Sequence, residues 1–252
     1  MKVSVICSTF RPGGIDIFLA GMRDQSIKDF ECILVDRRYE LRKKAVAKLS
    51  KEYGVSVIHV PEFKTNGKWI SFCSAWNTGM ALARGEVVVL LQDWTYCPPS
   101  FVAEHYKAVA AQRRYVIAPY VYTEIPSVLF KDSVNLTNQM RRGDMCVEWD
   151  KIMTGGVIDE VACFSEGLFS PKWLDTLPPL RPPDQDPRRH TEGPLSAYNW
   201  VHVKNESLLR SVAYELNGLD ERLERGKGPM DTDWGNRLQL AKLDFWWAPG
   251  AC

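Results

Sequence analysis

A run of five apolar residues, Val87–Leu91, constrains the fold more than any other feature of the sequence. Gly85 precedes this run and the pair Pro98-Pro99 follows it. Such a run between turn residues is typical of a strand covered on both faces in a parallel sheet. Asp93 comes just after it, at the strand end where open α/β sheets bind ligands. This carboxylate can hold a divalent cation against a diphosphate. The alternative is that Asp93 does no more than cap the turn before Pro98.

Strand and helix patterns alternate along the first hundred residues. Apolar runs predict strands at residues 3–7, 30–35 and 55–60, and helical spacing predicts helices at 15–25, 40–53 and 69–84. This alternation predicts right-handed βαβ units and a parallel sheet. In the helix at 40–53 we expect the basic residues to form a solvated face opposite Leu41, Ala45 and Leu49. These basic residues are Arg42, Lys43, Lys44 and Lys48.

The second half has a weaker pattern. It predicts a helix at 101–112, strands at 115–121, 199–203 and 245–247, and helices at 206–216 and 231–243. Residues from about 123 to 198 are irregular, and the segment 177–194 is too rich in proline for a regular element. We therefore expect an α/β fold: one domain over 1–252, with a mostly parallel sheet, helices on both faces and an insertion at about 123–198.

Composition narrows the range of partners and compartments. The net charge of +1 gives no strong field for nucleic acid or membrane. None of the seven cysteines form a CxxC pair, which argues against a zinc ribbon or disulfide scaffold and favours a reducing compartment. We expect Cys7 and Cys32 to be buried. The N-terminus is not a signal peptide and no segment approaches a membrane span, so we expect a cytoplasmic protein.

Two common phosphate-binding patterns are absent from the sequence. No GxGxxG follows the first strand, and GxxxxGK[ST] does not occur. Their absence lowers the case for a dinucleotide-binding domain and for a P-loop.

Five segments in order carry a resemblance to a known family. They are VSVICSTFRP, ILVD, AWNTGMALARGE, LLQDWTYCPP and NGLDERLERGKGPMDTDWGNRL. The chain resembles the family 2 glycosyltransferases of the GT-A fold, over residues 1–110 and 199–243. The resemblance implies a Rossmann-like GT-A domain that uses a nucleotide sugar, with a nucleotide-sugar half at 1–110 and an acceptor half at 111–252.

The resemblance also implies a donor site. Ser8, Thr9 and Phe10 fall where the family's first loop contacts the nucleotide base, with Arg11 just after them. Asp36 falls on the acidic residue that binds the base or the ribose. Asn77 falls on the Asn of the family's helix motif, but Trp76 replaces the Arg that usually precedes this Asn. Lys68 lies in a loop that often reaches the nucleotide and could supply the missing charge.

At the family's metal-binding DxD position the sequence reads Gln92-Asp93-Trp94. A cation there would be held by Asp93, with help from the Gln92 oxygen, water and the diphosphate. Mg²⁺ tolerates such a set best because it keeps several waters and leans on substrate phosphates, and Mn²⁺ is the other candidate. The family's C-terminal His, often a metal ligand, would lie beyond Cys252, so this ligand is absent from the sequence or follows it.

The late motif reads Met230-Asp231-Thr232-Asp233. Asp231 matches the family's catalytic base, and Met230 replaces the first acid of the usual pair. Carboxylates in a first helical turn also cap N–H groups without any catalytic role. We expect Asp231 to be the base and Asp233 to be the helix cap. Asp233, Trp234 and the loop at 181–190 are candidate acceptor contacts.

The sequence thus predicts an inverting, metal-assisted transfer of a sugar from a UDP-sugar or another nucleotide sugar to an acceptor hydroxyl. The acceptor can be a polysaccharide, a lipid-linked sugar, a protein or a modified nucleobase. Two alternatives stay open. One is a nucleotidyltransferase, with residues 11–14 as a faint Gly-rich loop. The other is a degenerate GT-A fold that only binds a nucleotide sugar or a partner, because the acids of the DxD motif are lost around Asp93 and Met230 replaces the first acid of the late pair.

Overall fold

In a computed structural model of the protein, the described residues are 1–10, 14–63, 72–93, 95, 97–118, 193–194, 201, 203–223 and 229–251. The strands in these ranges are β1 (Val3–Thr9), β2 (Phe30–Asp36), β3 (Val57–Val60), β4 (Val87–Gln92), β5 (Arg114–Ile117), β6 (Gly193–Pro194), β7 (Asn205–Leu209) and β8 (Asp244–Trp247). The helices are α1 (Ile15–Arg23), α2 (Tyr39–Tyr53), α3 (Phe72–Leu82), α4 (Phe101–Val109), α8 (Arg210–Glu215) and α9 (Pro229–Leu240), with short 3₁₀ turns η4 (Glu221–Leu223) and η5 (Pro249–Ala251).

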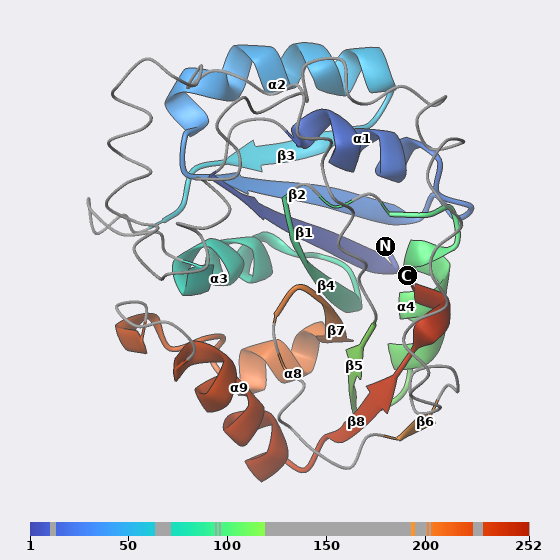
Figure 1. Cartoon of the computed structure of the whole chain (residues 1–252), viewed down its shortest axis with the longest axis vertical. Helices are drawn as coiled ribbons and strands as arrows, with labels where there is room; N and C mark the ends of the chain where they lie inside the picture. The colour runs from blue at the N-terminus through green and yellow to red at the C-terminus, as the bar shows by residue number, and fades with distance from the viewer. Residues whose placement is uncertain are drawn as a thin grey trace, which may run out of the picture.

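The strands form one eight-stranded sheet in the order β3-β2-β1-β4-β7-β5-β8-β6 (Figure 1). The pairs β2–β3, β1–β2, β1–β4 and β5–β8 are parallel, whereas β7 is antiparallel to both β4 and β5. The expected mixed α/β fold with a mostly parallel sheet is therefore confirmed.

The run at 87–91 lies in the middle of this sheet, and every one of its side chains is fully buried. The expected central position is correct. The strand is parallel to only one neighbour, however, because β7 returns alongside it in the opposite direction.

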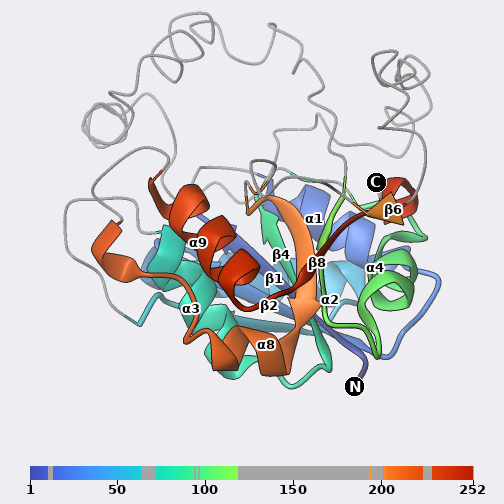
Figure 2. The same ribbon diagram turned by 90° about the horizontal axis from the view of Figure 1, so that it is seen from below.

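Helices cover both faces of the sheet (Figure 2). On one face α1, α2 and α4 pack on an apolar layer that includes Phe18, Val46 and Phe101. On the other face α3, α8 and α9 pack on a second layer that includes Trp76 and Trp234. The longer strands contribute side chains to both layers because successive side chains point to opposite faces.

Helix α3 lies unusually close to strand β1. A Cβ atom added at Gly79 would stand 2.2 Å from Cγ2 of Ile6, far inside van der Waals contact. Only glycine permits this approach, which brings the start of α3 near the end of β1.

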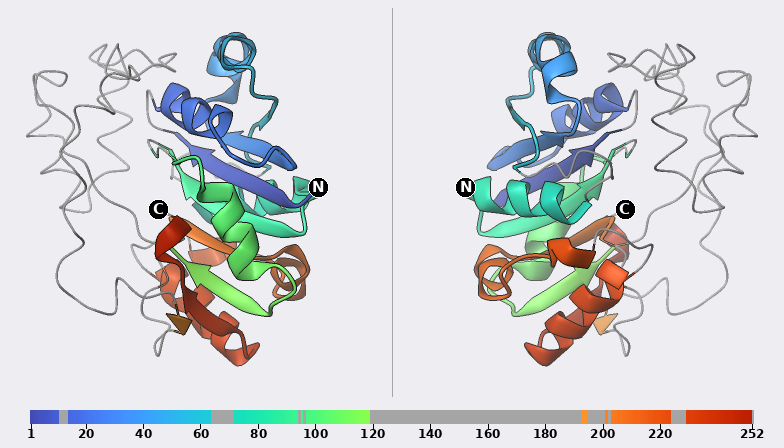
Figure 3. Two further views of the ribbon diagram at one scale, coloured as in Figure 1. Left: turned by 90° about the vertical axis from the view of Figure 1, so that its right-hand side faces the viewer. Right: turned by 90° about the vertical axis from the view of Figure 1, so that its left-hand side faces the viewer.

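Helix α4 is fastened to β7 by a buried polar network. His105 Nδ1 lies 2.7 Å from Ser207 Oγ, and its Nε2 lies 2.9 Å from Asn205 Oδ1. Asn205 in turn donates to the carbonyl of Ala251 in η5, which lies beside α4 (Figure 3). Burial lowers the pKa of His105 to about 4, so the ring is neutral near pH 7.

Two predictions for the second half are wrong. Residues 206–209 form strand β7 and not the start of a helix, since α8 begins at Arg210. Of the strand expected at 199–203, Val201 and Val203 are described and neither is in a strand. Glu206 misled the helix prediction because a charged residue is rare in a buried strand, and its burial depends on partners far along the chain. The insertion at 123–198 lies almost wholly outside the described residues. A third expectation, that 177–194 holds no regular element, is wrong at its last two residues, because Gly193 and Pro194 form β6 and pair with β8.

The expected burial of Cys7 and Cys32 is confirmed, and both are free thiols. Among the residues that the structure describes, no helix is both long and apolar enough to cross a membrane.

Candidate active site

The carboxyl ends of β1, β2 and β4 meet at one edge of the sheet. In the strand register Thr9 lies opposite Asp36, and Ser8 lies opposite Gln92. Two backbone hydrogen bonds continue this pairing past the strand ends, from Arg37 N to Thr9 O and from Asp93 N to Ser8 O, both at 3.1 Å. The sheet thus gathers residues that are far apart in the sequence.

Asp93 is fixed at this edge by the end of β1. Its Oδ2 accepts hydrogen bonds from Thr9 Oγ1 at 3.2 Å and from the backbone N–H of Phe10 at 3.4 Å. The side chain of Asp93 is almost wholly buried. The carboxylate is therefore held in one orientation before any ligand binds.

Asp36 is fully buried and surrounded by donors. Its Oδ1 accepts from the backbone N–H of Arg38 at 2.8 Å and from Arg42 Nη1 at 3.3 Å. Its Oδ2 lies 3.2 Å from His59 Nε2 at the end of β3. The negative charge of Asp36 is thus compensated inside the protein, as a buried carboxylate requires.

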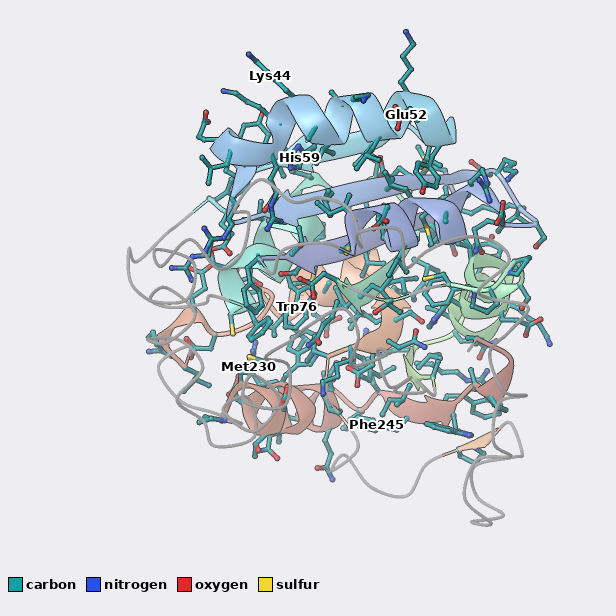
Figure 4. The ribbon with its side chains drawn as sticks, turned by 45° about the horizontal axis from the view of Figure 1, so that its top comes forward. Lys44, Glu52, His59, Trp76, Met230 and Phe245 are labelled. Atoms are coloured by element: carbon teal, nitrogen blue, oxygen red, sulfur yellow. The ribbon has the colours of Figure 1, made fainter. Side chains whose placement is uncertain are left out.

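The predicted solvated face of α2 is wrong for Arg42. Arg42, Val46 and Leu49 are the buried residues of this helix, and Leu41 is 46% exposed. The helix is rotated from the expected orientation because the guanidinium of Arg42 pairs with Asp36. Lys44 does extend into solvent, as expected, whereas His59 lies beneath α2 (Figure 4).

Arg42 also fixes the entrance to the first loop. Arg42 Nη2 and Arg38 Nε each donate to the carbonyl oxygen of Phe10 at 3.3 Å. The end of β1 is therefore clamped to the start of α2. Arg38, Arg42 and His59 were not among the predicted site residues. The one feature of the sequence that could have indicated them is that they lie near predicted strand ends.

Asn77 on α3 is tied to the segment after α8. Its Nδ2 donates to Leu219 O at 2.8 Å and to Glu221 Oε1 at 3.0 Å, and its Oδ1 accepts from Leu219 N at 2.8 Å. Gly218 permits this contact, because it has φ of +63° and a Cβ there would stand 2.3 Å from Asn77 Oδ1. Both donor hydrogens of the Asn77 amide are used within the protein.

Helix α9 begins at Pro229, a residue favoured at the first helical position. Asp231 therefore lies in the first turn and is half-buried. The prediction of Asp233 as the cap is wrong, since Asp233 is the fifth residue of the helix and accepts from Arg237 Nε at 2.8 Å. Met230 faces α3, with its Sδ 3.7 Å from Cys73 Sγ and with Trp76 nearby (Figure 4).

Trp234 is fully buried, so it has no exposed surface with which to contact an acceptor. Its indole Nε1 donates to the Tyr115 hydroxyl at 3.1 Å. Ser8 is also buried, and Gln92 is half-buried at the end of β4. Arg11, Lys68, Trp94 and the loop at 181–190 lie outside the described residues.

Comparison with protein-family models gives one match, described as glycosyl transferase family 2, over residues 4–168. This range is well over half of the chain and includes β1 to β5. The chain belongs to glycosyl transferase family 2. The resemblance inferred from the five sequence segments is therefore confirmed.

Solved structures agree with a family 2 fold. A crystal structure of S. aureus TarS 1-349 superposes with a TM-score of 0.57 at 12% identity, covering 99% of this chain and 60% of that one. The same TarS segment in complex with UDP gives a TM-score of 0.54 at 11% identity, again covering 99% and 60%. At such low identity the likeness shows the fold alone, and the chain spans 60% of the length of this TarS segment. A comparison with curated proteins finds no significant match.

The described residues offer few side chains that could bind a metal ion at this site. Among the described residues, no three His, Cys, Asp or Glu side chains are grouped so that they could hold a metal ion. Asp93 is the carboxylate that follows β4, with the half-buried Gln92 beside it. These oxygens suit a hard cation that takes most of its ligands from a diphosphate and from water.

Proposed function

We propose that this chain transfers a sugar from a nucleotide-sugar donor to an acceptor hydroxyl, with inversion at the anomeric carbon. The observation that carries the proposal is the convergence of Thr9, Asp36 and Asp93 at one sheet edge in a family 2 chain. Strand β8 is parallel to β5, and β4 and β5 are both antiparallel to β7, so β8 runs in the same direction as β4. Because α9 precedes β8, its start with Asp231 would lie toward this same edge.

The donor would lie across the ends of β1, β2 and β4. The loop of Ser8, Thr9, Phe10 and Arg11, together with Asp36, would receive the nucleoside, and Gln92 and Asp93 would lie toward the diphosphate. Lys68 would add a positive charge from its loop. A UDP-sugar is the first donor to test because the structurally similar TarS segment has been crystallised with UDP.

Two predicted donor contacts take indirect forms in this proposal. Because Asp36 is buried among Arg42 and His59, its influence on the base would pass mainly through these neighbours. Asn77 would support the site by holding the segment before α9, since its amide is committed to Leu219 and Glu221.

A divalent cation, Mg²⁺ or Mn²⁺, would be held by Asp93 and Gln92 against the diphosphate. When bound, it would neutralise charge that develops on the leaving diphosphate. The hydrogen bonds from Thr9 and Phe10 to Oδ2 already orient Asp93 for this role.

Asp231 would act as general base. An acceptor hydroxyl is a poor nucleophile at neutral pH, and a carboxylate that takes its proton during attack raises the rate. Attack from the face opposite the diphosphate inverts the anomeric centre. Asp233 is held by Arg237 and could border the acceptor, whereas Trp234 is too deeply buried to do so. The insertion at 123–198 would shape the choice among polysaccharide, lipid-linked, protein and nucleobase acceptors.

The first test is a panel of nucleotide sugars measured by thermal shift, with and without Mg²⁺ or Mn²⁺. A donor at about a hundred times its dissociation constant should stabilise the protein by about 2.7 kcal/mol. The shift should grow with metal and should shrink in Asp93→Ala. If no nucleotide sugar shifts the melting temperature of the folded protein, the proposal is wrong.

The second test separates catalysis from binding. Asp231→Asn should lower turnover by about a thousandfold, within the range for loss of a general base, and should leave UDP affinity unchanged. Gln92 and Met230, which replace family acids, favour a non-catalytic nucleotide-sugar binder as the second candidate. Binding without turnover in the wild-type protein would select that candidate, and full turnover in Asp231→Asn would exclude Asp231 as base.

A further inference from the structure

A buried network joins the sheet to α9 at Trp234, in the second turn of that helix. Tyr115 on β5 and Trp234 on α9 are fully buried, and Glu206 on β7 is 2% exposed. The Tyr115 hydroxyl donates to Glu206 Oε2, and the backbone N–H of Val203 donates to the same oxygen at 2.8 Å. Trp234 Nε1 donates to the Tyr115 hydroxyl oxygen at 3.1 Å.

The chemistry of these groups fixes the direction of each hydrogen bond. An indole N–H can only donate, so the hydroxyl oxygen of Tyr115 accepts and its hydrogen goes to Glu206. Burial and the neighbouring Glu206 charge hold the pKa of Tyr115 well above its usual value, so the hydroxyl stays protonated. The protonated Tyr115 hydroxyl therefore links the Glu206 carboxylate to Trp234 through two hydrogen bonds.

The strand register makes this bridge rigid at the sheet end. Ile117 lies opposite Glu206, so Tyr115 is the diagonal neighbour of Glu206 on the same face. Both side chains come from inner strands of the sheet and not from loops. The network thus connects two inner strands of the sheet to Trp234 on α9.

Asp231 lies on the face of α9 that this network holds. It precedes Trp234 by three residues, a spacing that puts two side chains on the same side of a helix. The negative charge of Asp231 contributes to the raised pKa of Tyr115, which places the two side chains in one electrostatic neighbourhood. The rotation of α9 that Trp234 sets is therefore the rotation that aims Asp231.

The same strand shows that packing alone does not require a carboxylate. Ser207 and Asn205, on the opposite face of β7, bond the neutral ring of His105 and fasten α4 with uncharged groups. A buried carboxylate costs more to desolvate than these groups do. Burying Glu206 therefore costs more free energy than burying Asn205 or Ser207, the neutral polar residues of the same strand.

We propose that Glu206 and Tyr115 are positioning residues, which hold α9 through Trp234 so that the Asp231 carboxylate meets the acceptor hydroxyl. The inference rests on the proposed function, because it takes Asp231 as the base. Glu206 and Tyr115 touch no substrate in this role and act only through α9.

The test compares three single variants of the whole chain. Tyr115→Phe removes the bridging oxygen and keeps the ring, Glu206→Gln keeps an acceptor oxygen, and Ser207→Ala removes a buried hydrogen bond on the other face of β7. UDP release from a panel of UDP-sugars, with water as the acceptor of the sugar, gives kcat, and titration with UDP gives the dissociation constant. Hydrogen exchange of residues 229–235 reports on α9 without any need for activity.

In Tyr115→Phe we expect kcat to fall by about ten- to a hundredfold, UDP affinity to change by less than twofold, and exchange at 229–235 to rise about tenfold. Glu206→Gln keeps an acceptor oxygen but loses the charge, so kcat should fall by about two- to tenfold, less than in Tyr115→Phe. Ser207→Ala should loosen α4 and leave kcat near the wild-type value. An α9 that exchanges as in the wild type, or a kcat that falls no more than in Ser207→Ala, overturns the proposal. Should the wild-type protein turn over no donor, the proposed function fails while the exchange experiment still decides whether this network holds α9.

Discussion

The two faces of the sheet are built differently although the same strands supply both. The face under α1, α2 and α4 is an apolar layer whose polar insertions include the Asp36–Arg42 pair and the His105 network. The face under α3, α8 and α9 holds Trp76, Tyr115 and Trp234 around a buried carboxylate. Hydrogen bonds from Asn77 and Arg237 also tie its helices together.

This difference indicates that the polar groups of the first face mainly stabilise the fold, whereas those of the second face also position Asp231. On the first face the polar groups are neutral or charge-paired, and they fasten α2 and α4 to the strand ends. On the second face the polar groups join α3, α8, α9 and the sheet, and so they set where Asp231 lies. The first face should therefore respond to mutation in stability, and the second should respond in turnover as well.

The largest expected effect is from Arg42→Met on the first face. It removes the only buried guanidinium partner described for Asp36 and leaves that carboxylate to His59 and one N–H. Breaking a buried ion pair costs about 3–5 kcal/mol, which urea denaturation would measure. We also expect weaker UDP binding, because the Phe10 carbonyl loses one of its two arginine contacts.

The control for this variant is Lys43→Met on the same helix. Lys43 pairs with Glu40 at 2.6 Å and both side chains are exposed, so no measurable loss of stability is expected. Equal losses in the two variants would show that Arg42 acts as an ordinary surface charge and would remove its role at the site.

A smaller effect is expected from Asn77→Ala on the second face. Three hydrogen bonds to the segment at 219–221 are lost, and Leu219 keeps a polar N–H and carbonyl without these partners. The expected loss is about 2–3 kcal/mol, with lower kcat and UDP affinity changed by less than twofold. A large loss of UDP affinity at unchanged stability would instead make Asn77 a direct nucleotide contact.

Arg222→Ala serves as the matched control in the same segment. Its guanidinium pairs with Asp220 at 2.6 Å on the exposed surface and lowers the pKa of that carboxyl to about 2. No measurable change in stability or in kcat is expected, since an exposed ion pair contributes little.

The smallest effect sharpens the comparison through pH. His105 has a folded pKa of about 4, below its unfolded value of about 6.5, so the unfolded chain binds the proton first as pH falls. The stability contributed by the neutral ring is present above about pH 6.5 and is lost as pH falls toward 4. Between pH 7 and pH 5 the wild-type protein should lose about 2 kcal/mol through this group.

His105→Gln should lack this part of the pH dependence, which denaturation at the two pH values would show. The variant should keep its kcat per folded molecule, because the ring lies on the face away from α9. A variant as acid-sensitive as the wild type would mean that other groups cause the loss.

Local patterns in the sequence were enough for the first half of the fold. Apolar runs and helical spacing gave β1, α1, β2, α2, β3, α3 and β4 in the right order, because each element buries residues close together in the chain. The same patterns failed at residues 206–209. In the local sequence pattern, Glu206 favours a helix. In the folded protein Tyr115, ninety-one residues earlier, supplies the hydrogen bond that lets this carboxylate lie in a buried strand.

Candidate site residues divide in the same way. Asp36 and Asp93 could be chosen from the sequence because a carboxylate after a buried strand marks the sheet edge where ligands bind. Arg42 could not be chosen, since its helix offers an equally good apolar face through Leu41 and Ala45. Arg42 is buried because it pairs with Asp36 at the end of β2. The apolar spacing of a helix cannot predict such a pairing.

By itself the sequence determined the fold class and the family, because both follow from the order of short local segments. It also predicted the edge of the sheet where we propose that the donor binds. Tertiary structure alone decided which polar groups are buried together. Desolvated charges and hydroxyls are stable only where partners meet them at hydrogen-bonding distance. For Asp36 with Arg42, and for Glu206 with Tyr115 and Trp234, those partners come from different elements that only the folded sheet brings together.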